Sequence, residues 1–228
     1  MGYCNPAANE ADTKEMPMPD LNQLTDAILK GDAKSAVAVT REALAASSDP
    51  VELVTKYMIP AMDEVGKRFE CQEYFVPELL LSARAMKGAL ELIRPLLTAQ
   101  GATPAGRVVI GTVKGDLHDI GKNLVASMLE GSGFEVTDLG TDVAPAKFVA
   151  EAQAKRANLV ALSALLTTTM PAMRVTVEEF QKAGIRDRIK IIIGGAPVTQ
   201  QYAEQIGADG YSDNANGAVA LARRMMGS

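Results

Sequence analysis

The chain has 228 residues, of which 47% are hydrophobic, enough for one or two domains with a sizeable core. A formal charge of −5 without any basic run argues against a nucleic-acid-binding surface. Two scattered cysteines and a single histidine argue against a disulfide framework and a structural zinc site, and they favour the reducing cytoplasm. No apolar segment has the length of a signal-peptide core or a membrane span, so no membrane partner is expected.

The first hundred residues carry helical periodicity. Residues 1–19 contain three prolines and no apolar pattern, so a flexible N-terminal arm is expected there. Beyond it, apolar residues at steps of three and four predict a four-helix bundle over residues 20–99. Asp32 and Asp49 are placed to cap the second and third helices, and Pro60 is expected to kink the third. The apolar side of the second helix is predicted to run through Val37, Thr40 and Leu44.

The second half of the chain alternates between strand-like and helical segments. Residues 100–106 are small and aperiodic, which is typical of a linker. Continuous apolar strands after it indicate a parallel sheet covered on both faces. With right-handed crossovers this gives a flavodoxin-like, doubly wound α/β domain over residues 107–228. The five strands are predicted at 107–112, 134–138, 158–163, 189–193 and 209–211.

The single histidine, His118, lies in the loop after the first strand, at the sheet edge where open α/β domains bind ligands. Neutral imidazole is a good transition-metal ligand, and it normally donates its other ring N–H to a carboxylate or carbonyl. Asp116 is placed to be that carboxylate, whereas Asp119 is expected to cap the following helix. On this local chemistry alone, a hydrogen-bonded or solvated histidine without a metal is the commoner case.

Two further strand ends are expected at the same edge of the sheet. The third strand ends at Ser163 and Leu165, and the fourth ends at Gly194 and Gly195. Taken singly, these are an ordinary hydroxyl and a strand-to-helix turn that needs positive φ. Taken together, they leave a slot without large side chains, into which a long ligand could be inserted. The glycines after the first strand lack the Gly-x-Gly-x-x-Gly pattern, and Asp138 is a weak ribose ligand, so a nicotinamide enzyme is a poor fit.

The three segments together resemble a known fingerprint. Asp116-x-His118-x-x-Gly121, then 41 residues, Ser163-x-Leu165, then 28 residues, and Gly194-Gly195 resemble the cobalamin-binding motif shared by methionine synthase and its corrinoid-protein relatives. The segment 75–87 resembles the helical cap of that family. The resemblance therefore covers the chain from about residue 20 to its end.

This resemblance implies a base-off corrinoid, with His118 binding cobalt in place of the cofactor's own base. It implies that Thr169, where the family is expected to have serine, extends the Asp116–His118 pair, and that the pair takes up a proton when His118 leaves the cobalt. Phe69 and Val76 match cap residues over the cofactor, with bundle core as the alternative. The nucleotide tail is expected in the slot lined by Ser163, Leu165, Gly194 and Gly195, and Gly121 is a further expected cofactor-binding residue.

A barrel, a cysteine-rich zinc site and an activation domain are absent from the sequence, so the resemblance implies a free-standing, non-catalytic corrinoid carrier. Such a carrier accepts a methyl group on Co(I) from a substrate-specific methyltransferase. It hands the group from methyl-Co(III) to a second methyltransferase, which passes it to tetrahydrofolate or a thiol, and a reductive activase is a further expected partner. The segment 194–199 resembles carriers for methyl ethers or methylamines. A cobalamin-dependent sensor and a flavodoxin-like interaction domain are the alternatives.

Overall fold

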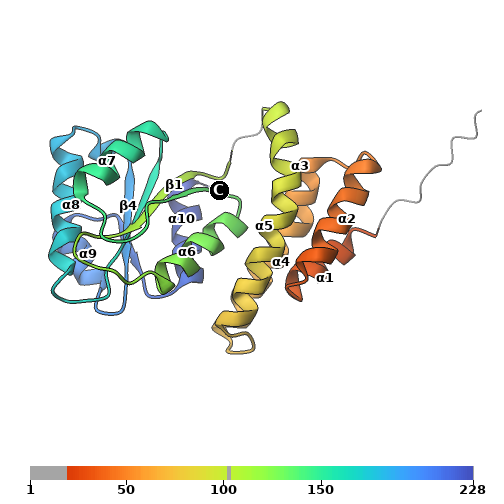
Figure 1. Ribbon diagram of the computed structural model, residues 1–228, viewed down its shortest axis with the longest axis horizontal. Helices are drawn as coiled ribbons and strands as arrows, with labels where there is room; N and C mark the ends of the chain where they lie inside the picture. Colours follow the sequence, from red (N-terminus) through yellow and green to blue (C-terminus); the bar gives the residue numbers. More distant parts are fainter. Residues whose placement is uncertain (1–19, 102–103, 228) are drawn as a thin grey trace, which may run out of the picture.

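The computed structural model describes residues 20–101 and 104–227. A group of helices is followed by an α/β domain, and the two pack side by side (Figure 1). The expected arm at 1–19 and the linker residues 102–103 lie outside the described residues. Within the described parts of the chain, no helix is long and apolar enough to cross a membrane.

The helical domain contains the four predicted helices, one of them broken into three parts. Asp32 and Asp49 accept hydrogen bonds from backbone N–H groups of the first turns that follow them, as predicted. The break at Pro60 is a π-helical segment that comes just before the proline, whose missing N–H interrupts the regular helical ladder. The elements are α1 (Asn22–Leu29), α2 (Ala33–Ala45), α3 (Pro50–Glu52), the π-helical η1 (Leu53–Met58), α4 (Ile59–Glu70) and α5 (Val76–Ala99).

The predicted apolar side of α2 is partly wrong. The buried side chains are Ala36, Val39, Thr40 and Ala43, whereas Val37 and Leu44 are only half buried. Alanines carry little weight in a hydrophobic pattern, yet here their small side chains let α2 pack closely against α5.

The α/β domain is built on a five-stranded parallel sheet in the order β2-β1-β3-β4-β5, which is the flavodoxin-like order that was predicted. Each strand lies within one residue of its predicted position at either end. The register aligns Thr112, Ser163 and Gly194 at the ends of the three central strands, so the loops that follow them meet at one edge. The strands are β1 (Arg107–Thr112), β2 (Glu135–Asp138), β3 (Leu159–Ser163), β4 (Lys190–Gly194) and β5 (Gly210–Ser212).

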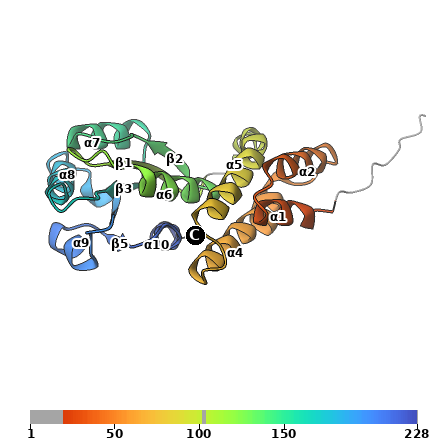
Figure 2. The same ribbon diagram turned by 60° about the horizontal axis from the view of Figure 1, so that its bottom comes forward.

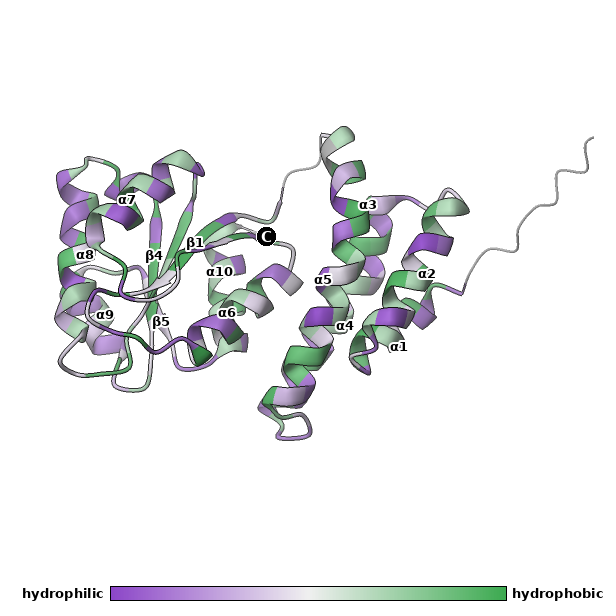
Figure 3. Ribbon diagram, in the orientation of Figure 1, coloured by the Kyte–Doolittle hydropathy of each residue, from purple (hydrophilic) through white to green (hydrophobic). Residues whose placement is uncertain are grey.

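Helices cover both faces of the sheet. In Figure 2, α7 and α8 lie beyond the sheet, while α6 and α10 lie between it and the helical domain. Figure 3 shows hydrophobic residues concentrated on the strands and on the inner sides of the helices. The helices are α6 (Ile120–Gly131), α7 (Pro145–Ala154), α8 (Met170–Lys182), the 3₁₀ helix η2 (Arg186–Arg188), α9 (Gln200–Ile206) and α10 (Ala215–Met226).

The helical domain packs on the α/β domain through a shared apolar core. Buried residues of α4 and α5 belong to the same hydrophobic cluster as those of α6 and α10. At Gly131, an added Cβ would lie 3.2 Å from the Met62 methyl group, so the two domains approach closely there. Polar contacts surround this core: Arg223 donates to Asp63 at 2.5 Å, and the Asn216 amide donates to Glu70 at 2.7 Å. The helical domain is therefore held against α6 and α10, which cover one face of the sheet.

Candidate functional site

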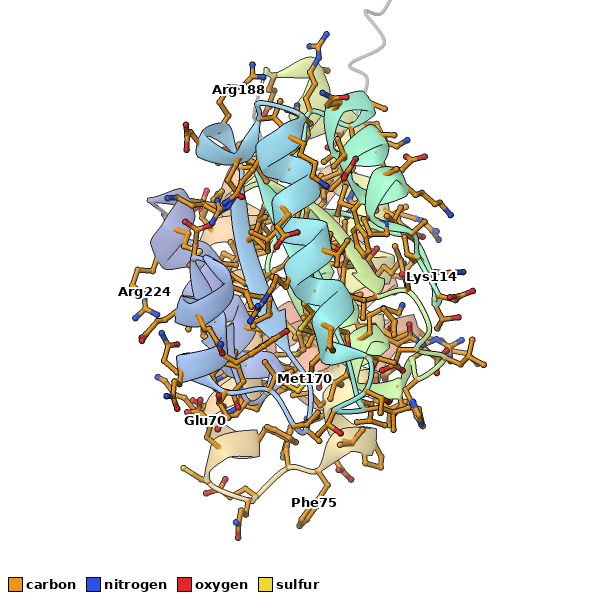
Figure 4. All side chains as sticks on the ribbon, turned by 90° about the vertical axis from the view of Figure 1, so that its left-hand side faces the viewer. Glu70, Phe75, Lys114, Met170, Arg188 and Arg224 are labelled. Atoms are coloured by element: carbon orange, nitrogen blue, oxygen red, sulfur yellow. The ribbon has the colours of Figure 1, made fainter. Side chains whose placement is uncertain are left out.

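A cavity of about 590 Å³ opens at the carboxyl ends of β1, β3 and β4. Figure 4 shows Met170, at the start of α8, toward the same end of the molecule as Phe75 of the helical domain. All three segments of the predicted fingerprint reach this cavity, although long stretches of chain separate them. The predicted site residues that line it are Phe69, His118, Gly121, Ser163, Leu165, Gly194 and Gly195.

The histidine loop is held in a fixed shape by its own hydrogen bonds. The Thr112 hydroxyl, at the end of β1, donates to the His118 carbonyl oxygen at 2.7 Å. Asp116 Oδ1 accepts the His118 backbone N–H at 3.0 Å and lies 3.0 Å from its ring Nδ1. The imidazole side chain is 52% exposed and borders the cavity. Because Nδ1 faces the carboxylate, Nε2 is the ring nitrogen that can bind a metal.

The Asp116 carboxylate is buried, with a side-chain exposure of 0%. Its Oδ2 accepts the Leu165 backbone N–H and the Thr169 hydroxyl, both at 2.7 Å. Burial by itself raises the pKa of Asp116, but hydrogen bonds from Thr169, Leu165 and His118 outweigh it and hold the pKa well below its usual value. An ionised carboxylate can only accept hydrogen bonds, so in the neutral imidazole Nδ1 of His118 is the nitrogen that carries the proton and Nε2 is the one with the free lone pair.

Thr169 contacts Asp116 from the side away from the cavity lining. It precedes α8, is buried, and contacts the carboxylate without lining the cavity. Its hydroxyl also lies 2.9 Å from the Leu166 carbonyl oxygen, but the charged carboxylate is the stronger acceptor for its single proton. The Thr169 hydroxyl therefore lies where the resemblance expects it, hydrogen-bonded to the carboxylate that in turn contacts His118.

The glycine turn after β4 brings two strand ends close together. Gly195 has a φ of +130°, and a Cβ at this position would lie 1.8 Å from the Ala164 carbonyl oxygen. No residue with a side chain fits there without a shift of the backbone. Part of the cavity lining is apolar and includes small side chains. The apolar lining residues of the sheet and of α6 and α10 include Ile110, Leu124, Val125, Ala161, Ile192, Ala215 and Ala218.

Comparison with known proteins identifies the family. A model of the B12 binding domain matches residues 106–220, and a second B12 binding domain model matches residues 20–94. The chain is 45% identical over 203 residues to trimethylamine corrinoid protein 1 of Methanosarcina acetivorans, covering 88% of this chain and 94% of the relative. The chain belongs to the corrinoid proteins. This corrinoid protein is also 42% identical over 194 residues to dimethylamine corrinoid protein 1 of the same organism, covering 85% of this chain and 91% of that relative.

Solved structures agree with this assignment. The corrinoid protein matches the methanol:cobalamin methyltransferase complex of Methanosarcina barkeri with a TM-score of 0.81 and 29% identity, over 93% of this chain and 81% of that chain. It matches a cobalamin-binding protein of Desulfitobacterium hafniense DCB-2 with a TM-score of 0.74 and 35% identity, over 90% of this chain and 98% of that chain. The predicted family, fold and corrinoid cofactor are confirmed, and the alternative of a flavodoxin-like interaction domain is set aside.

Two expectations concern single residues. Val76, in the first turn of α5, does not line the cavity, whereas its predicted companion Phe69 does, so a place for Val76 over the cofactor stays a prediction. Asp119 occupies the N-cap position of α6, but its side chain makes no capping bond to the helix backbone, so that prediction is wrong. Its carboxylate instead accepts the Asn123 side-chain amide at 3.1 Å.

A buried lysine at the cavity was missed. The Lys122 side chain is 1% exposed, forms an ion pair with Asp138 and donates to Asn123 Oδ1 at 2.6 Å. The Asp138 carboxylate, at the end of β2, is therefore engaged by Lys122. Neither residue type nor spacing marks the contact, because it depends on how α6 packs beside β2.

Proposed function

We propose that this corrinoid protein carries methyl groups in a methylamine methyltransferase system, with His118 as the protein ligand to cobalt. The observation that carries the proposal is the convergence of all three fingerprint segments on one cavity, beside a histidine whose Nδ1 is held by a buried carboxylate. The relatives named trimethylamine and dimethylamine corrinoid proteins support methylamines, rather than methyl ethers, as the methyl source.

The residues at the cavity fit a base-off corrinoid. His118 would bind the metal through Nε2, and Phe69 would close the cavity from the helical domain. The bound corrinoid supplies a cobalt centre that can take up a methyl group and release it. The apolar side chains of Leu117 and Ile120 flank His118 and are 74% and 81% exposed, a surface that a large cofactor would cover. The nucleotide tail would lie among Gly121, Ser163, Leu165, Gly194 and Gly195.

In the proposed cycle, the protein's residues set which nitrogens of the His118 ring carry a proton. Asp116 stays ionised and holds the proton on Nδ1, so Nε2 is ready to bind. An Nε2 that is not bound to cobalt would be open to protonation from solvent, because half of the ring is exposed. The resulting imidazolium is stabilised by the Asp116 carboxylate. A neutral pair therefore favours the ligated state, and a protonated pair favours release.

The partners follow from the carrier role. A solved structure that this chain matches is a methanol:cobalamin methyltransferase complex, which supports the assembly of this fold with a methyltransferase. For this chain we propose an amine-specific methyltransferase that delivers the methyl group and a second methyltransferase that removes it, with a reductive activase to restore oxidised cofactor.

A methyl-transfer assay tests the proposal. Protein loaded with hydroxocobalamin and then reduced is mixed with an amine-specific methyltransferase and trimethylamine or dimethylamine, and alkylation of the cofactor is followed by its absorption. The matched mixture contains methanol and the methanol-specific methyltransferase. We expect alkylation with the amines and little with methanol. Alkylation in the methanol mixture alone would overturn the methylamine assignment.

A further inference from the structure

We infer that Asp142 is a second positioning residue for His118, holding the histidine loop from the side opposite Thr169. Asp142 lies between β2 and α7, outside the fingerprint and outside the cavity. The inference rests on the proposed ligation of cobalt by His118, because its purpose is to fix that ligand.

Three hydrogen bonds join Asp142 to three successive residues of the histidine loop. Its backbone N–H donates to the Asp116 carbonyl oxygen at 2.9 Å. Its Oδ1 accepts the Gly115 backbone N–H at 2.8 Å, and its Oδ2 accepts the Lys114 ammonium at 2.9 Å. Asp142 thus contacts residues 114–116, which precede His118 in the loop, through both its backbone and its side chain.

Asp116 is consequently fixed from two directions. Asp142 holds its backbone carbonyl, while Leu165 and Thr169 hold its carboxylate. The backbone N–H and the ring Nδ1 of His118 both meet the same acceptor oxygen of Asp116, Oδ1. A movement of the Asp116 backbone would therefore disturb the backbone and the ring of His118 together, and Asp142 opposes that movement.

The segment that carries Asp142 is itself anchored to the sheet. Val143 donates its N–H to the Thr112 carbonyl oxygen at 3.0 Å and forms a parallel bridge with Val113. Asp142 has a φ of +54°, a conformation that aspartate, asparagine and glycine adopt more readily than other residues. The ion pair with Lys114 is exposed on both sides, so it contributes little. The hydrogen bonds to the loop backbone carry the positioning role.

The test measures cobalt ligation in the loaded protein. In the Co(II) state, electron paramagnetic resonance shows a splitting from a coordinated imidazole nitrogen, which gives the ratio of histidine-bound to histidine-free cofactor. We expect Asp142→Gly, which removes the carboxylate and tolerates the positive φ, to lower this ratio about tenfold, as for the loss of one hydrogen bond that orders a ligand. Asp142→Asn retains an acceptor for Gly115 and is expected to stay within about twofold of wild type.

Controls separate the possible outcomes. Lys114→Ala removes only the ion pair and is expected to leave the ratio unchanged. Asp142→Ala also removes the carboxylate but does not add the backbone flexibility of glycine. The test therefore does not depend on the folding of a single truncated variant. If both truncations bind a full equivalent of corrinoid and keep the wild-type ratio, the inference is overturned; an equal loss in Lys114→Ala would overturn it too. If wild type itself shows no nitrogen splitting, the proposed ligation by His118 fails, which is a distinguishable result.

Discussion

Replacing Thr169 by valine tests the buried hydrogen bonds behind the histidine. Valine has nearly the same shape as threonine but lacks the hydroxyl that donates to Asp116 Oδ2 at 2.7 Å. Both residues are buried, so water cannot easily replace the lost donor. The carboxylate keeps its bonds from Leu165 and His118.

The expected magnitude follows from the charge of the acceptor. A hydrogen bond to a buried charged group contributes about 1.5–3 kcal/mol, so we expect Thr169→Val to lower the free energy of unfolding by about 2 kcal/mol at neutral pH. Thr169→Ser keeps the hydroxyl and loses only a methyl group. This control is expected to cost less than about 1 kcal/mol.

The effect should depend on pH in a defined direction. The pKa of Asp116 is lower in the folded protein than in the unfolded chain. Such a carboxyl adds stability above its unfolded pKa of about 3.9, and this stability is lost as the pH falls. Thr169→Val moves the folded-state pKa of Asp116 up toward its ordinary value, so the difference between variant and wild type is full at neutral pH and shrinks only as the pH falls through the folded-state pKa of Asp116 in the variant.

Urea unfolding of the cofactor-free protein, followed by circular dichroism, measures this difference. Wild type, Thr169→Val and Thr169→Ser are compared at neutral pH and at several acidic values. A Thr169→Val variant as stable as wild type at neutral pH would refute the reasoning. So would a deficit that stays constant through the acidic range, because that would trace the loss to packing rather than to the charge on Asp116.

Two further substitutions test other parts of the site, both by chemical unfolding. Gly195→Ala would place a Cβ 1.8 Å from the Ala164 carbonyl oxygen and is expected to lower the free energy of unfolding by more than about 3 kcal/mol. The control Gly140→Ala, at a positive φ with open space around it, is expected to lower it by about 1 kcal/mol. Equal losses in the two variants would contradict the clash. Lys122→Met leaves Asp138 without its buried partner and is expected to cost about 2 kcal/mol, less than for a fully buried pair because Asp138 is partly exposed; a variant as stable as wild type would show that the pair is dispensable.

The fold was largely predictable because its signals are local. Continuous apolar runs mark the buried parallel strands, and five of them alternating with helices, joined by right-handed crossovers, indicate a doubly wound sheet. The Asp116–His118 contact was predictable for the same reason, since two residues in one loop cannot lie far apart. The shared edge of Ser163 and Gly194 needed only the rule that parallel strands end together.

The features that escaped prediction depend on packing between distant segments. Lys122 meets Asp138, and Asp142 meets the histidine loop, only because β2 lies beside β1 in the sheet. The buried side of α2 was misplaced because alanine is a weak marker of a core face. Thr169 was recognised through the family resemblance rather than through its chemistry, because its partner lies 53 residues away in the chain.

The central claim is that His118 ligates the corrinoid, and reconstitution of the His118→Ala variant tests it most directly. Wild type and variant are each mixed with hydroxocobalamin and desalted, and the cobalt spectrum of the retained cofactor is recorded. The account predicts a full equivalent of base-off corrinoid in wild type, with a changed cobalt spectrum in the variant because the imidazole is missing. Identical spectra in the two proteins, with the cofactor retained in both, would contradict the assignment of His118.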